Sequence, residues 1–199
     1  MGLKSESIAI SGGQFRGRKI PLPPAVSGHR HFTPSLLKEA VFQLLNNRGS
    51  SGPFWDLCTG SGQMGLEALS RGFQPVHMVE LDRSRFSWLR KVCREYPVTL
   101  HNKDFLRTPP MILEARSPNT VCFLDLPYSF WSRDQCPKLD AFLHGLQKAH
   151  TDEPLPFIVV QAPHRYSISS EELEYWVNAS YQWEFREYRG RYLILLDPR

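Results

Sequence analysis

Two acidic residues beside turn-forming segments carry the chemistry that this sequence suggests. Asp56 ends an apolar run and precedes the glycine-rich turn T-G-S-G at residues 59–62, which opens a helix. Glycines let the backbone come close to a ligand, and the N-terminus of the helix offers unpaired N–H groups. A carboxylate here repels a pyrophosphate but attracts the ammonium and sulfonium of S-adenosylmethionine (SAM), so the pattern favours SAM over NAD.

Further acidic and apolar residues extend this predicted cofactor site. The next expected strand ends at Glu80, 18 residues after Gly62, where a carboxylate can accept both ribose hydroxyls. After the third strand, Asp104 can accept from the adenine amine and Phe105 can cover its ring, unless the pair is only a helix N-cap and a core aromatic. The assigned cofactor-binding residues are Asp56, Cys58, Gly60, Ser61, Gly62, Glu80, Leu81, Asp104 and Phe105.

The segment D-L-P-Y at residues 125–128 follows the fourth strand and resembles the [D/N/S]-P-P-[Y/F] motif of SAM-dependent N-methyltransferases. A planar exocyclic amine is a poor nucleophile. The Asp125 carboxylate and the Leu126 carbonyl can accept its two N–H bonds and direct its lone pair, while Tyr128 stacks on the ring. We assign catalysis to Asp125, Leu126, Pro127 and Tyr128. Leu126 replaces a proline, and the alternative is an ordinary turn.

Apolar periodicity predicts one α/β domain in which strands and helices alternate. A central strand leads to Asp56, and further strands are expected at 76–80, 98–101, 120–124, 157–161, 183–188 and 191–196. Helices are expected after the glycine turn, at 36–46, 83–95 and 139–149, and from 169 to about 177, with Thr33-Pro34 or Ser35 capping the first. The fold class is therefore a Rossmann-like, mostly parallel seven-stranded sheet with helices on both faces, plus a small N-terminal hairpin.

Positive charge is concentrated at the N-terminus. The chain has 199 residues and a net charge of +4, and residues 1–35 hold five basic residues against one acidic residue, so they carry the whole excess. We predict RNA binding by Arg16, Arg18, Lys19 and Arg30, with a solvated loop as the alternative. We divide the chain into a basic β-hairpin extension, 1–32, and a methyltransferase domain, 33–199.

Several other classes of protein are not expected. The apolar runs are far too short to span a membrane, and no signal-peptide pattern opens the chain. Four cysteines are spread singly, which indicates reduced thiols, and His29-x-His31 is the only close histidine pair, so no metal site is expected. We expect a cytoplasmic, monomeric protein without a membrane partner.

Taken in order, the motifs resemble the RsmD-like family of guanine-N2 methyltransferases of bacterial small-subunit (16S) ribosomal RNA. They are S-G-G at 11–13, R-G-R-K at 16–19, K-E-A-V-F at 38–42, D-L-C-T-G-S-G at 56–62, G-L-E-A-L-S-R-G at 65–72, V-E at 79–80 and D-L-P-Y at 125–128. The resemblance implies a class I SAM-dependent fold and a flipped-out guanine, within a small subunit or its assembly intermediate. The chain departs from the family at Leu126 and at H-F-T-P, residues 31–34, where the family has R-P-T.

Three alternatives remain open at this point. The same amine-binding motif serves N-methyltransferases of DNA adenine and of protein glutamine. The pattern G-x-G-x-x-G together with Glu80 also fits an NAD-dependent oxidoreductase. Finally, Leu126 is compatible with an RNA-binding relative that has lost activity.

Overall fold

The sheet has seven strands in the order β5-β4-β3-β6-β7-β9-β8. The computed structural model describes residues 7–23, 33–131, 137–147, 154–162, 180–188 and 190–199. β3 (Phe54–Asp56), β4 (Val76–Val79), β5 (Val98–His101), β6 (Val121–Asp125) and β7 (Phe157–Ala162) are parallel. β9 (Arg191–Pro198) runs antiparallel to β7 and to the edge strand β8 (Tyr181–Tyr188). The predicted mostly parallel sheet is confirmed.

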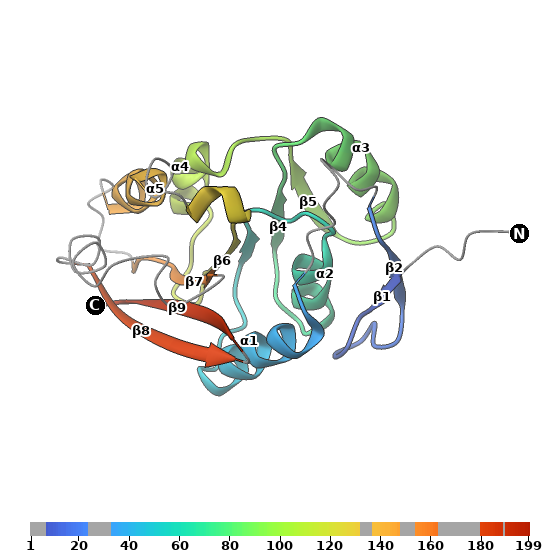
Figure 1. The fold of residues 1–199 in the computed structure, drawn as a ribbon, viewed down its shortest axis with the longest axis horizontal. Coiled ribbons are helices and arrows are strands. Elements are labelled where there is room, and N and C mark those ends of the chain that lie inside the picture. The colour runs from blue at the N-terminus through green and yellow to red at the C-terminus, as the bar shows by residue number, and fades with distance from the viewer. Residues whose placement is uncertain (1–6, 24–32, 132–136, 148–153, 163–179, 189) are drawn as a thin grey trace, which may run out of the picture.

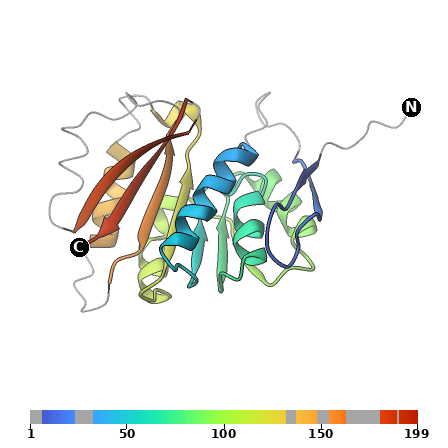
Figure 2. The ribbon, with the colours of Figure 1, turned by 90° about the horizontal axis from the view of Figure 1, so that it is seen from below.

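Helices cover both faces of this sheet, as expected. α1 (Ser35–Asn47), α2 (Gln63–Ser70) and α3 (Arg83–Val92) contribute to one buried cluster, and α4 (Pro109–Glu114) and α5 (Pro137–Gln147) to the other. Figure 1 shows α1 and α2 on the lower side of the sheet and α4 and α5 at its upper left, and Figure 2 gives the perpendicular view. Two short 3-10 helices, η1 (Phe105–Arg107) and η2 (Tyr128–Trp131), follow β5 and β6.

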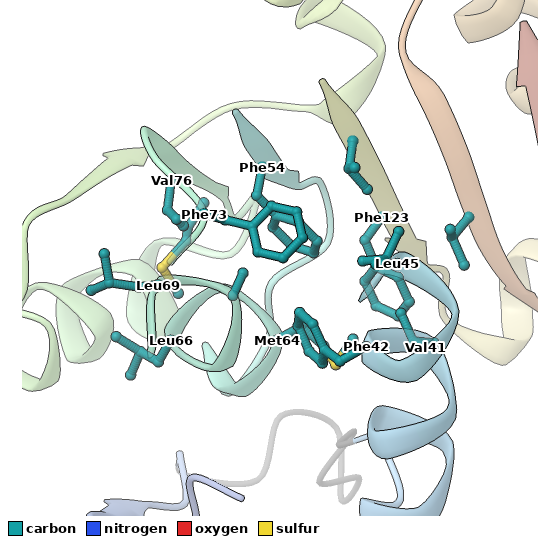
Figure 3. Close-up of a cluster of buried hydrophobic side chains, with 14 of the residues drawn as sticks. Val41, Phe42, Leu45, Phe54, Met64, Leu66, Leu69, Phe73, Val76 and Phe123 are labelled. Atoms are coloured by element: carbon teal, nitrogen blue, oxygen red, sulfur yellow. The ribbon is translucent and has the colours of Figure 1, made fainter. Parts of the chain in front are cut away.

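Strand residues alternate between the two clusters because successive side chains of a strand point to opposite faces. Phe54 packs under α1 and α2, whereas its neighbour Trp55 faces the opposite cluster. Figure 3 shows Phe42, Phe54 and Phe73 in this cluster, and the centroids of the Phe42 and Phe73 rings lie 6.0 Å and 5.5 Å from that of Phe54 and 6.2 Å from each other. This packing fixes β3, which ends at Asp56, against the helix that follows the glycine turn.

The N-terminal hairpin, β1 (Ser7–Ala9) and β2 (Lys19–Pro21), forms a separate two-stranded sheet. It is held by Glu67 of α2, whose side chain is fully buried. Ser11 N and Gly12 N donate to its carboxylate at 2.9 and 2.8 Å, and Lys38 Nζ lies 2.8 Å away. Burial raises the pKa of Glu67, but these partners outweigh it and hold that pKa below its usual value. The buried, negatively charged carboxylate of Glu67 thus attaches the hairpin to α2.

Some boundaries and one cap differ from the expectation. Thr33 and Ser35 do not cap α1: the N-cap position is Pro34, with no side-chain hydrogen bond, because the Thr33 hydroxyl donates to Asp125 instead. α3 ends at Val92 rather than at 95, and Cys93 takes its C-cap position. α4 is a helix that the sequence pattern does not predict. The helix expected from 169 and the pair His29 and His31 lie outside the described residues.

No helix in the described ranges is both long enough and apolar enough to cross a membrane.

Candidate active site

A cavity of about 490 Å³ opens at the carboxyl edge of the parallel strands. This is where α/β sheets bind ligands, since the loops after neighbouring strands converge there. Most of the residues assigned from the sequence line it: Asp56, Cys58, Gly60, Ser61, Glu80, Leu81, Asp104, Phe105, Asp125, Leu126 and Pro127. Gly62 is not among the lining residues, and the side chain of Tyr128 falls outside the described residues.

Asp56 is held at the end of β3 by the turn that follows it. The Thr59 hydroxyl donates to its Oδ2 at 2.6 Å, and the backbone N–H of Gly65 donates to the same oxygen at 3.0 Å. Only 1% of the residue is exposed. Burial raises the pKa of Asp56 to about 7, although both hydrogen bonds act to lower it. A buried carboxyl group with such a raised pKa favours a cationic ligand beside it.

The glycine turn and Glu80 form a second acidic wall. Gly60 and Gly62 have φ of 50° and 75°, the left-handed region that glycine adopts without strain. At Gly62 a side chain would be strained by this φ, and its Cβ would lie 2.9 Å from the side-chain ends of Leu89 and Met78. Gly60 N donates to Glu80 Oε2 at 3.1 Å, and Asp82 N donates to Oε1 at 2.9 Å. Burial raises the pKa of Glu80 against these bonds.

The side chains after β5 complete this end of the cavity. Asp104 Oδ1 accepts from Leu106 N at 3.0 Å and so caps η1, while Phe105 is buried with its ring edge-on to Phe130 at 5.7 Å. The alternative of an N-cap and a core aromatic therefore describes their local structure, yet both also line the cavity. Leu81 is 65% exposed beside them. Leu81, Asp104 and Phe105 together form a slot in the cavity wall that is apolar except for the Asp104 carboxylate.

Asp125 stands at the end of β6 and is linked to the glycine turn through Thr33. The buried Thr33 hydroxyl donates to Asp125 Oδ2 at 2.9 Å, and the carbonyl of Thr33 accepts from Gln63 Nε2 at 2.9 Å. Gln63 is the first residue of α2. Burial raises the pKa of Asp125 to about 6, although the Thr33 hydroxyl and the nearby charge of Arg191 act to lower it. The two carboxylates, Asp56 and Asp125, share one cavity.

Sequence reasoning missed several residues of the cavity wall. Gln63 and Gln161 line it with buried carboxamide oxygens, which accept no hydrogen bond from the described part of the chain. Gln161 is the last residue of the expected strand 157–161. Because ligands bind at the carboxyl ends of parallel strands, its position indicates a site residue just as that of Asp125 does. Arg191 reaches the same edge because β9 is antiparallel and begins where the parallel strands end. Thr33 was interpreted only as a cap.

Three of the four predicted RNA-binding residues are described, and none of these three is among the residues that line the cavity. Arg16, Arg18 and Lys19 are exposed on the hairpin, and the Arg18 guanidinium lies over the rings of Phe15 and Tyr96, 4.9 Å and 5.9 Å from their centroids. The fourth, Arg30, lies outside the described residues. Figure 1 shows the hairpin beside α3.

Comparison with known proteins extends these observations. The chain is similar to the ribosomal RNA small subunit methyltransferase D of Escherichia coli K12, with 31% identity over 124 residues, 62% of each chain. It is also similar to a putative rRNA methyltransferase, YlbH, of Bacillus subtilis, with 27% identity over 158 residues, 77% of this chain and 82% of that one. The chain thus matches less than two thirds of the length of the Escherichia coli relative.

Solved structures and a family model agree with this. A putative methyltransferase from Escherichia coli, yhhF, superposes with a TM-score of 0.72 at 23% identity, over 98% of this chain and 99% of that chain. At this identity the likeness shows the fold, which is that of class I methyltransferases. The family model described as Conserved hypothetical protein 95 matches residues 8–181. The chain therefore belongs to this family, which is the RsmD-like family that its motifs resemble.

Proposed function

We propose that this protein transfers a methyl group from SAM to the exocyclic N2 amine of a guanine in small-subunit ribosomal RNA. The observation that carries the proposal is that Asp56 and Asp125, at the ends of the neighbouring strands β3 and β6, line one cavity. One carboxylate suits a cationic methyl donor and the other suits an amine. The relatives named as rRNA methyltransferases support the class of substrate.

The residues present fit SAM, which supplies a methyl group bonded to a sulfonium. Asp56 and the unpartnered Oε1 of Gln63 offer acceptors for an ammonium group beside the glycine turn. Glu80 offers carboxylate oxygens for the ribose hydroxyls. The slot formed by Leu81, Asp104 and Phe105 suits the adenine, whose amine can donate to the acidic edge. An anionic pyrophosphate would instead meet Asp56 and Glu80, which disfavours NAD.

At the other end of the cavity, Asp125 and the Leu126 carbonyl hold the amine. They accept its two N–H bonds, direct its lone pair along the path of attack and stabilise the positive charge that develops on nitrogen. Thr33 fixes one carboxylate oxygen of Asp125, so the other faces the amine. Once the methyl group has moved, the amine is cationic and loses a proton, which Asp125 can accept. Pro127 and Tyr128 complete this loop, with Tyr128 stacking on the base.

We assign substrate binding outside the cavity to the hairpin. The extension, residues 1–32, carries the excess positive charge, and its Arg16, Arg18, Lys19 and Arg30 suit RNA phosphates. Residues 33–199 form the catalytic domain. A paired guanine cannot bring N2 to a methyl donor inside a cavity, so the base must leave its helix. We propose the small subunit or an assembly intermediate as the substrate particle.

The test is transfer of a tritiated methyl group from SAM to naked rRNA and to small subunits from a strain that lacks the gene. Asp125→Ala should lose at least a hundredfold in rate yet bind SAM with unchanged affinity. Asp197→Asn is the matched control, because this carboxylate lies away from the cavity and forms a partly exposed ion pair with Arg48. Unchanged turnover by Asp125→Ala, or binding of NAD without binding of SAM, would refute the proposal.

A further inference from the structure

Gln161 carries a buried amide for which the described residues supply no hydrogen-bond partner. It belongs to β7, lines the cavity and is only 5% exposed. Its Oε1 is fully buried and accepts no hydrogen bond, and the bonds formed among the described residues include none from its Nε2. Burying a polar group without a partner is destabilising. An amide that lines a cavity wall and finds no partner among the described residues is therefore well placed to bind a ligand.

The sheet places this amide next to the amine-binding carboxylate. Gln161 is the register partner of Asp125 across the parallel pair of β7 and β6. Partners in neighbouring parallel strands project from the same face, about 4.8 Å apart. β3, which carries Asp56, flanks β6 on the opposite side. A base with its amine at Asp125 and a methyl donor above β3 must therefore extend its ring toward β7.

The groups that follow N2 along the edge of guanine complement a carboxamide. N1–H is a donor and O6 is an acceptor, whereas the amide offers one acceptor, Oε1, and donors on Nε2. We propose that Gln161 selects guanine by accepting from N1–H and donating to O6. This inference rests on the proposed function. Adenine has an unprotonated N1 next to its amine and a C–H beyond it, so it can form only one of the two bonds.

This assignment makes a prediction about folding that a structural role does not. Gln161→Leu keeps a side chain of similar size but removes both polar atoms. If the amide serves only a ligand, no bond within the chain is lost, and the melting temperature should stay the same or rise. If the amide instead supports the fold, the same substitution should lower the melting temperature and weaken cofactor binding.

The experiment compares the full-length protein with Gln161→Leu, Gln161→Glu and Gln43→Leu. Gln43→Leu is the matched control, because this amide is exposed on α1 and donates to Asn47 Oδ1 of the same helix. The substrate is the small subunit from a strain that lacks the gene. Nucleoside mass spectrometry identifies the product, initial rates give kcat/KM, calorimetry measures S-adenosylhomocysteine binding, and a thermal scan gives the melting temperature.

We expect Gln161→Leu to lose about tenfold to a hundredfold in kcat/KM, with S-adenosylhomocysteine binding within twofold of wild type. Gln161→Glu keeps the acceptor for N1–H but places a negative charge toward O6, so it should lose at least as much. Gln43→Leu should match the wild type.

The proposal and the proposed function fail in different ways. If the wild type forms N2-methylguanosine and Gln161→Leu retains kcat/KM within twofold, only the role of Gln161 is refuted. A melting temperature lowered by several degrees, together with lost S-adenosylhomocysteine binding, assigns Gln161 to the fold and also refutes its role. If the wild type methylates a base other than guanine, the proposed function is wrong and the selection of guanine falls with it.

Discussion

The hydroxyl of Thr33 should set the pH dependence of the proposed methyl transfer. It donates to Asp125 Oδ2 at 2.9 Å from a position that is 3% exposed, and Asp125 has a pKa of about 6. A hydrogen bond to a charged acceptor contributes about 1.5–3 kcal/mol. Since one pKa unit corresponds to about 1.4 kcal/mol, Thr33→Val should raise the pKa of Asp125 by about 1–2 units.

The sign of the effect follows from the role of Asp125, whose negative charge stabilises the cationic amine only when the carboxyl group is ionised. At pH 7 the ionised fraction should fall from roughly nine tenths to between a half and a tenth, and at pH 9 it should be almost complete. Thr33→Val should therefore be about twofold to tenfold slower than wild type at pH 7 and recover at pH 9.

The assay is the initial rate of methyl transfer to small subunits between pH 5.5 and pH 9.5. Thr33→Ser keeps the hydroxyl and is the control, so its pH profile should match that of the wild type. A Thr33→Val profile that superimposes on the wild type would show that this hydrogen bond does not tune Asp125. A uniform loss at every pH would show that Thr33 acts on position alone.

Two further predictions concern the cofactor and the hairpin. Because the pKa of Asp56 is raised to about 7, its carboxylate becomes protonated below pH 7, and the affinity for cationic SAM should fall by up to about tenfold per pH unit. In Asp56→Asn the affinity for SAM, measured by calorimetry, should not change with pH over this range. Glu67→Gln leaves Lys38 and the Ser11 and Gly12 amides facing an amide group, so the free energy of unfolding should fall by about 3–5 kcal/mol and the melting temperature by about 6–20 °C. Limited proteolysis should then cut the hairpin faster, and unchanged melting would contradict the proposed anchor.

The sequence was most informative where local patterns decide the structure. A strand, an acidic residue and a glycine turn predicted the surroundings of Asp56 because backbone conformation and helix N-termini are local properties. The meeting of Asp56 and Asp125 could also be foreseen, since the carboxyl ends of parallel strands share one edge. Eleven of the thirteen residues assigned to the cofactor and to catalysis line one cavity, while Gly62 does not line it and the side chain of Tyr128 is outside the described residues.

What could not be predicted depends on contacts between distant segments. Thr33 has the spacing of a helix cap, and only the packing of α1 against β6 turns its hydroxyl toward Asp125. Lys38 and Glu67 look like ordinary charged residues of two helices, yet both are almost completely buried and paired. Nothing in a helical pattern indicates that a lysine points inward. α4 is six residues long and begins with two prolines, too short to show periodicity.

The position of β9 has a consequence for the order in which the sheet is assembled. β7 is buried at every position, and β9, which comes later in the chain, covers its outer edge. Until β9 has been synthesised, the apolar segment 157–160 has unpaired backbone groups open to other nascent chains, a condition that promotes aggregation. In the complete sheet β8 is the edge strand on this side, and its residues Glu184 and Arg186 form an exposed ion pair. The C-terminal hairpin therefore covers the aggregation-prone edge of β7 and leaves a charged strand, β8, at this edge of the sheet.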